Sequence, residues 1–101
     1  MATLLQIDFP FTRPFGQEMS AALADLARSI AQEPGLVWKI WTENAAEKLA
    51  GGIYLFTDGA SADAYLAMHS ARLASFGITG IRACKFEVNE ALTRLTRGPA
   101  A

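Results

Sequence analysis

His69 is the only histidine of the chain, with a tyrosine four residues before it and an arginine three residues after it. On a helix, side chains three or four positions apart are neighbours, so Tyr65, His69 and Arg72 are expected to lie together. An imidazole can give or take a proton near neutral pH, and an arginine can stabilise an oxyanion through charge-assisted hydrogen bonds. The spacing predicts a catalytic site for proton transfer and anion stabilisation. The competing interpretation is an ordinary core or surface histidine.

A second group of interest is aromatic and lies within residues 33–58, where two apolar runs separated by a polar connector indicate a β-hairpin. Trp38 and Trp41 are three positions apart, so in a regular strand they point to opposite faces. In the functional interpretation, Trp38 lies beneath the second predicted helix and forms a substrate-binding wall with Tyr54 and Phe56. Trp41 is expected at a subunit contact. Either tryptophan could instead be a plain core or interface anchor.

Two lysines lie in the middle of predicted strands, where a charge needs a partner. We expect Lys39 and Lys85 to pair with acidic residues of a second subunit, such as Glu43 or Glu87, rather than to take part in catalysis. The lone Cys84 is expected to be a small buried hydrophobe.

The composition narrows the class of protein. A chain of 101 residues with 51% hydrophobic and 19% charged residues fits one compact domain over residues 1–101. A net charge of −1 with scattered basic residues disfavours nucleic acid and anionic membranes as partners. The N-terminus lacks a secretory signal pattern, and no apolar run approaches the roughly 18 residues of a membrane span. Together with a single cysteine, these features predict a cytoplasmic protein.

Cofactor motifs are also absent from the sequence. One cysteine and one histidine are too few for a structural zinc site, which usually takes four nitrogen or sulfur ligands. No glycine-rich phosphate-binding motif follows the first predicted strand. We therefore expect no metal, nucleotide or flavin cofactor.

Periodicity and capping signals predict the elements that position these residues. The alternation of residues 3–9 indicates a strand whose buried side carries Leu5, Ile7 and Phe9. The expected order is strand 3–9, helix 15–32, strand 36–43, strand 51–57, helix 59–75 capped by Asp58 and ended by Gly77, strand 81–88, and a short helix capped by Asn89. This order predicts an α+β, ferredoxin-like fold in which two helices cover one face of a four-stranded antiparallel sheet.

The opposite face of this sheet is also apolar on the predicted periodicity. Its expected apolar residues are Leu4, Val37, Trp41, Ile81 and Ala83. A second copy of the sheet would cover them, so we predict a homodimer.

Three motifs carry a resemblance to a known family. They are EPG-x-x-WK-x-WTE at residues 33–43, GGIYLFTD at residues 51–58 and AYL-x-x-H-x-x-RL at residues 64–73. Together they resemble the YdhR-type monooxygenases, and the similarity extends from the N-terminus to Glu90. The resemblance implies a dimeric α+β barrel of ferredoxin-like subunits. It also implies kinship with cofactor-independent monooxygenases that oxidise polycyclic phenols and anthrones to quinones.

The expected function is therefore that of an oxidoreductase, a monooxygenase acting on a planar, electron-rich aromatic compound with dioxygen. A protein without metal or flavin can contribute positioning, deprotonation and a dry pocket, while the substrate supplies the electron. The alternatives are a non-catalytic dimeric module that binds the same ligand and a haem-degrading monooxygenase. Against haem degradation, this chain has no counterpart to the asparagine that such enzymes place on the first strand, where it has Gln6, Ile7 and Asp8.

Overall fold

The structure, a computed structural model, describes residues 2–99, so both ends of the predicted 1–101 domain lie outside the described residues. The strands are β1 (Thr3–Pro10), β2 (Leu36–Asn44), β3 (Leu49–Phe56) and β4 (Arg82–Glu87). The helices are α1 (Gly16–Ala22), α2 (Ala24–Ala31), α3 (Gly59–Ser75) and α4 (Glu90–Leu95).

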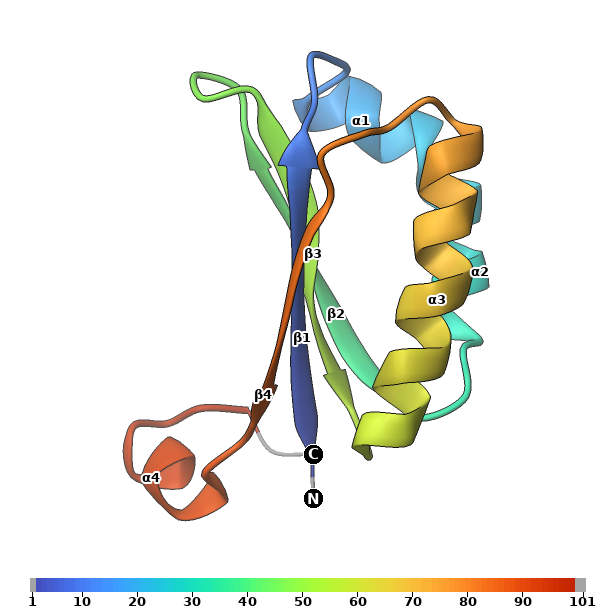
Figure 1. The fold of residues 1–101 in the computed structure, drawn as a ribbon. Helices are drawn as coiled ribbons and strands as arrows, with labels where there is room; N and C mark the ends of the chain where they lie inside the picture. The colour runs from blue at the N-terminus through green and yellow to red at the C-terminus, as the bar shows by residue number, and fades with distance from the viewer. Residues whose placement is uncertain (1, 100–101) are drawn as a thin grey trace.

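The four strands form one antiparallel sheet in the order β2-β3-β1-β4. Figure 1 shows α1, α2 and α3 on one face of this sheet and α4 near one end, on the side away from α3. Two strand–helix–strand halves are thus interleaved so that β1 and β3 occupy the centre. The predicted ferredoxin-like α+β fold is confirmed.

The core lies between the sheet and the three covering helices. Leu5, Ile7 and Phe9 of β1 are buried there, as their alternation predicts. Antiparallel pairing places Leu5 opposite Tyr54, whose side chain on β3 is therefore on the same face. Tyr54 and Phe56 are both fully buried against Tyr65 of α3.

The helical segment after β1 differs from the prediction of one continuous helix. It forms α1 and α2, which meet at Leu23, and this residue has φ −106° and ψ 9°. The apolar periodicity of Met19, Leu23, Leu26 and Ile30 continues through the break, and these side chains all pack on the core. The apolar spacing therefore predicts the buried face of this segment correctly, but it does not predict the interruption of the helix at Leu23.

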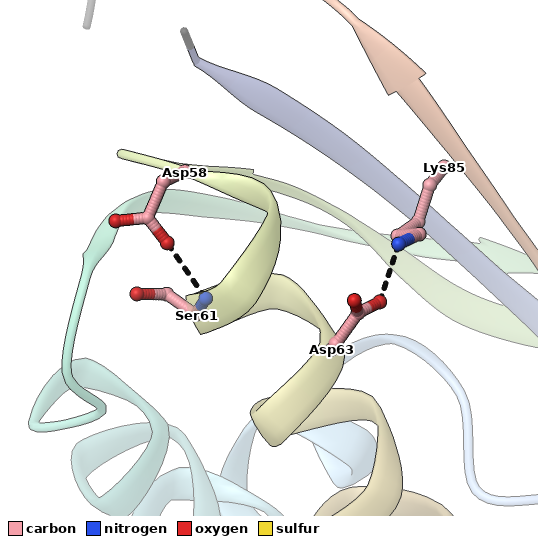
Figure 2. A network of polar contacts seen from close by, with 4 residues as sticks. All are labelled: Asp58, Ser61, Asp63 and Lys85. Atoms are coloured by element: carbon pink, nitrogen blue, oxygen red, sulfur yellow. Dashed lines mark hydrogen bonds and ion pairs between the residues drawn. The ribbon is translucent and has the colours of Figure 1, made fainter.

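The ends of α3 agree with the prediction. The Asp58 carboxylate accepts a hydrogen bond of 2.7 Å from the backbone N–H of Ser61, which satisfies one free donor of the first turn (Figure 2). Gly77, which follows the helix, has a φ of +83° that favours glycine. Figure 2 also shows Lys85 of β4 paired with Asp63 of α3. The prediction that this lysine pairs with an acidic residue of a second subunit is therefore wrong, because its partner lies in the same chain.

Strand β2 contains an irregularity that the sequence does not reveal. Leu36 lies opposite Phe56 and Trp38 lies opposite Leu55, so Val37 is an extra residue without a partner on β3. Side chains alternate between faces with a period of two, so one extra residue moves all later residues of the strand to the other face.

The bulge reverses the predicted positions of the two tryptophans. Lys39 lies opposite Tyr54 and Trp41 opposite Gly52, so both face the helices. Trp38 lies on the open face, where it borders a hollow with Leu4, Leu55 and Phe86. The expectation of opposite faces is confirmed, but the face assigned to each tryptophan is wrong because it assumed a regular strand.

The open face of the sheet is more apolar than a solvated surface needs to be. Ile40 of β2 and Phe86 of β4 remain 52% and 50% exposed. Cys84 is also exposed, contrary to the prediction of a buried side chain. Within residues 2–99, the indole Nε1 of Trp38 is the one buried side-chain nitrogen or oxygen atom without a hydrogen-bond partner.

Candidate active site

A cavity of about 370 Å³ lies between the sheet and the covering helices. Its wall is mainly apolar and includes Phe9, Met19, Leu73 and Phe76. The polar or charged groups in the wall are Arg13, Lys39, Thr42, Tyr54 and His69. An apolar cavity with few convergent polar groups is typical of a small-molecule site.

His69 enters this cavity from α3 and is only 3% exposed. Its Nδ1 atom accepts hydrogen bonds from the Arg72 guanidinium, at 3.0 Å from Nη2 and 3.3 Å from Nε. A guanidinium can only donate, so Nδ1 presents its lone pair and the ring hydrogen of neutral His69 is on Nε2. Among the described residues no hydrogen bond uses Nε2, so this N–H is available to a ligand in the cavity.

The surroundings of His69 keep the imidazole neutral. Burial is the largest cause, followed by repulsion from Lys39 and Arg72, and together they lower the pKa of His69 from 6.5 to about 4. At pH 7 the ring therefore carries no charge and presents a hydrogen-bond donor rather than a base. This arrangement suits stabilisation of an oxygen atom that gains negative charge.

Two tyrosines support the histidine. The ring of Tyr65 stacks on His69 with centroids 4.9 Å apart and planes 21° apart, and the Tyr65 hydroxyl donates to the Tyr54 hydroxyl at 3.1 Å. Burial raises the pKa of Tyr54 to about 12 and raises the pKa of Tyr65 as well, so both phenols stay protonated. Tyr54 lines the cavity, whereas Tyr65 and Phe56 lie behind the wall and hold it in place.

Arg72 also lies behind the cavity wall. Besides its bonds to His69, its guanidinium donates to the Ser29 hydroxyl of α2 at 3.4 Å. The predicted helical neighbours Tyr65, His69 and Arg72 are thus brought into contact. Of these three, only His69 lines the cavity.

Lys39 and Trp41 of β2 lie in the cavity wall, although the sequence led us to expect both at a subunit contact. The Lys39 ammonium lies 3.3 Å from the centre of a Trp41 ring and 4.6 Å from the centre of the Tyr54 ring. Within residues 2–99 no ion pair joins Lys39 to a carboxylate, and Glu43 instead accepts a hydrogen bond from Gly16. A lysine and a tryptophan two positions apart on one strand lie on the same face, so the sequence could have indicated the contact between them. Which face of the sheet they occupy depends on the bulge.

The environment of Lys39 disfavours its charge. Burial, followed by repulsion from Arg72, lowers its pKa to about 7. The face of the Trp41 ring favours the ammonium form and acts against these two effects. Lys39 therefore divides between amine and ammonium near neutral pH, which is unusual for a lysine.

Two further features bear on the class of protein, metal-binding clusters and membrane-spanning helices. The described part of the chain contains no group of three or more His, Cys, Asp or Glu side chains arranged to hold a metal ion. None of the helices within residues 2–99 has the length and apolar character needed to cross a membrane.

Solved structures similar to this chain share its fold. A variant of SnoaB, a cofactor-independent oxygenase from Streptomyces nogalater, is 17% identical with a TM-score of 0.60, covering 87% of this chain and 93% of that one. A protein described as a "putative antibiotic biosynthesis monooxygenase" from Deinococcus radiodurans is 15% identical with a TM-score of 0.55, covering 88% and 93%. A Nitrosomonas europaea protein of unknown function is 21% identical with a TM-score of 0.60, covering 87% and 89%.

No curated protein matches the chain in sequence. The family described as "Putative mono-oxygenase ydhR" matches residues 4–99, which is nearly the full length. The three motifs noted in the sequence fall within this range, as do His69 and the other residues that line the cavity. The chain therefore belongs to the ydhR mono-oxygenase family.

Proposed function

We propose that this protein is a monooxygenase that oxidises a planar, electron-rich aromatic molecule with dioxygen and without a bound metal or flavin. One observation carries the proposal: a largely apolar cavity holds a flat aromatic wall and a neutral histidine with a free N–H. Trp41 and Tyr54 form the wall, and His69 presents the N–H. SnoaB, whose fold is similar, is a cofactor-independent oxygenase, which is consistent with this chemistry.

The reaction follows from what such a cavity can do. Loss of a proton converts a phenol or anthrone into an anion, and the anion transfers one electron to dioxygen. The two radicals combine to a peroxide, which loses water to give a quinone. For an anthrone, one substrate molecule and one dioxygen yield one anthraquinone and one water. The protein excludes water and holds the anionic oxygen near a hydrogen-bond donor.

The roles of the predicted site residues follow from their positions. His69 would donate through Nε2 to the substrate oxygen, and Arg72 would fix the ring from the other nitrogen. Tyr65 would hold the histidine plane by stacking and would position Tyr54 by its hydrogen bond. Trp41 takes the place assigned to Trp38 from the sequence, and Phe56 supports the wall from behind.

An oxygen electrode tests the proposal directly. Purified protein with anthrone or a hydroquinone should consume oxygen, and His69→Ala should slow consumption by about 10². Met68→Ala is the matched control, because Met68 is adjacent on α3, is 37% exposed and does not line the cavity. An unchanged rate in the histidine variant would remove His69 from the mechanism. Tight binding of a quinone without oxygen uptake would favour a binding module, and a Soret shift on adding haem would favour haem chemistry.

The working unit is proposed to be a homodimer joined through the open face of the sheet. Ile40 and Phe86 on that face, and Leu92 and Leu95 on α4, remain at least half exposed. A second copy would bury these side chains and could give the Trp38 indole a hydrogen-bond acceptor. Light scattering after size exclusion should give twice the chain mass, and Ile40→Lys should halve it while Met68→Lys on α3 leaves it unchanged. A monomeric wild-type protein at micromolar concentration would refute the dimer.

A cytoplasmic location is proposed as well. Cys84 is a free thiol, and a reducing compartment keeps such a group out of disulfides. Fractionation of the native host with an antibody against the chain tests the location, and recovery from the medium or an oxidising compartment would contradict it.

A further inference from the structure

Lys39 is held at the cavity wall by the shape of its neighbours. Its stem crosses over Gly52, where an added Cβ would lie only 2.5 Å from Lys39 Cε. Its ammonium lies between the rings of Trp41 and Tyr54. The absence of a side chain at Gly52 therefore lets Lys39 lie flat against the sheet and place Nζ in the cavity wall.

The charges around this nitrogen are all positive or neutral. Arg13 from the loop before α1 is the other charged residue in the wall, and no aspartate or glutamate lines the cavity. From α3, Arg72 repels Lys39, and His69 is neutral at pH 7. From β3, Tyr54 stays protonated. Lys39 therefore lacks an anionic partner in the described cavity, and a ligand could supply one.

We propose that Lys39 is the base of this site, taking the hydroxyl proton of a bound phenolic substrate and holding the resulting anion as an ion pair. This inference rests on the function proposed above. In the step, the O–H bond breaks, its electron pair stays on the substrate oxygen, and the proton forms the third N–H bond of the Lys39 ammonium. No electron passes to another molecule in this step, and the charge of the complex does not change.

The roles of Lys39 and His69 in the cavity are thereby separated. His69 cannot readily accept a proton, since Nδ1 is already bonded to Arg72 and protonation of the ring would create a third cation beside Arg72 and Lys39. Lys39 has a free amine population near neutral pH, because burial and Arg72 lower its pKa. A lysine base and a neutral histidine donor would thus act together on one phenol.

The test uses 2-naphthol, whose absorption moves to longer wavelength when its hydroxyl ionises. Under argon at about pH 8, free 2-naphthol is neutral and Lys39 is mainly an amine. Bound 2-naphthol should show the absorption band of the naphtholate. No proton should be released to the buffer, and calorimetry in buffers of different ionisation enthalpy measures this release. Lys39→Met should reduce the ratio of ionised to neutral bound probe at least about tenfold, because it removes the adjacent cation. Lys48→Met, at an exposed lysine outside the cavity, should leave the ratio unchanged.

A second variant distinguishes a base from a fixed charge. Lys39→Arg retains the cation but cannot accept a proton, so the bound probe should ionise while about one proton per site appears in the buffer. With a phenolic substrate and oxygen, Lys39→Met should lose about 10² or more in kcat/KM. A naphtholate band that persists in Lys39→Met, or equal proton release by wild type and Lys39→Arg, would overturn the proposal. The spectra are recorded without oxygen, so they decide the role of Lys39 even if no substrate is oxidised.

Discussion

Protonation of His69 should by itself lower the stability of the folded protein in acid, and the size of this loss in the free energy of unfolding can be calculated. The folded protein holds the pKa of His69 at about 4, against an ordinary value of 6.5. At a pH between these two pKa values, His69 is protonated in the unfolded chain and neutral in the folded chain. The free energy of unfolding therefore falls as the pH falls. The contribution is intact above about pH 6.5 and is lost progressively down to about pH 4. A difference of about 2.5 pKa units corresponds to about 3 kcal/mol.

Two measurements check this prediction. Because His69 is the only histidine, its ring signals in a carbon–proton NMR titration need no assignment. Urea unfolding at several pH values gives the stability of wild type and of His69→Phe, which keeps an aromatic ring on Tyr65 but cannot be protonated. The carboxylates that also titrate in acid, such as Asp58, are common to both proteins, so their effect cancels in the difference.

The expected result is a wild type that loses about 3 kcal/mol more than His69→Phe between pH 7 and pH 4. Partial loss of the contact with Arg72 in the protonated state would reduce the difference without changing its sign. A histidine signal that titrates near 6.5 in the folded protein, or equal acid sensitivity of the two proteins, would refute the reasoning.

Three further predictions concern positions whose role the structure makes specific. Asp58→Ala should cost about 1 kcal/mol in urea unfolding, because it leaves the Ser61 N–H of α3 without its cap, and Asp58→Asn should recover most of the loss. Gly52→Ala should displace the flexible Lys39 stem and weaken 2-naphthol binding. Gly51→Ala should lower the melting temperature more than Gly52→Ala does, because its Cβ would overlap backbone atoms of β1. Equal stability of the two alanine variants would contradict this contrast. Trp41 lines the cavity and Trp38 lies on the open face, so Trp41→Leu should remove most of the fluorescence quenching caused by a bound quinone, whereas Trp38→Leu should not. The reverse pattern would mean that the ligand binds the open face of the sheet.

Local signals were sufficient for much of the fold. Alternation along β1 identified Leu5, Ile7 and Phe9 as buried, because the period of a strand is a property of the backbone. The bounds of α3 followed from the cap at Asp58 and the glycine after its end. The neighbourhood of His69 with Tyr65 and Arg72 followed from helical spacing in the same way.

The cavity wall depended on information that the sequence of one strand does not contain. The pairing of β2 with β3 decided that Val37 bulges, and this single extra residue exchanged Trp38 for Trp41 and brought Lys39 beneath the helices. The register of a strand is set by its partner and by burial of one face, so residues 36–44 alone fit either arrangement. Likewise, helical spacing placed Arg72 beside His69, but only the packed structure showed that the guanidinium occupies Nδ1. The sequence thus determined which elements form and which residues are neighbours along a helix. Contacts between elements decided which side chains face the cavity. The folded side-chain conformation of Arg72 on α3 decided which nitrogen of His69 carries the hydrogen.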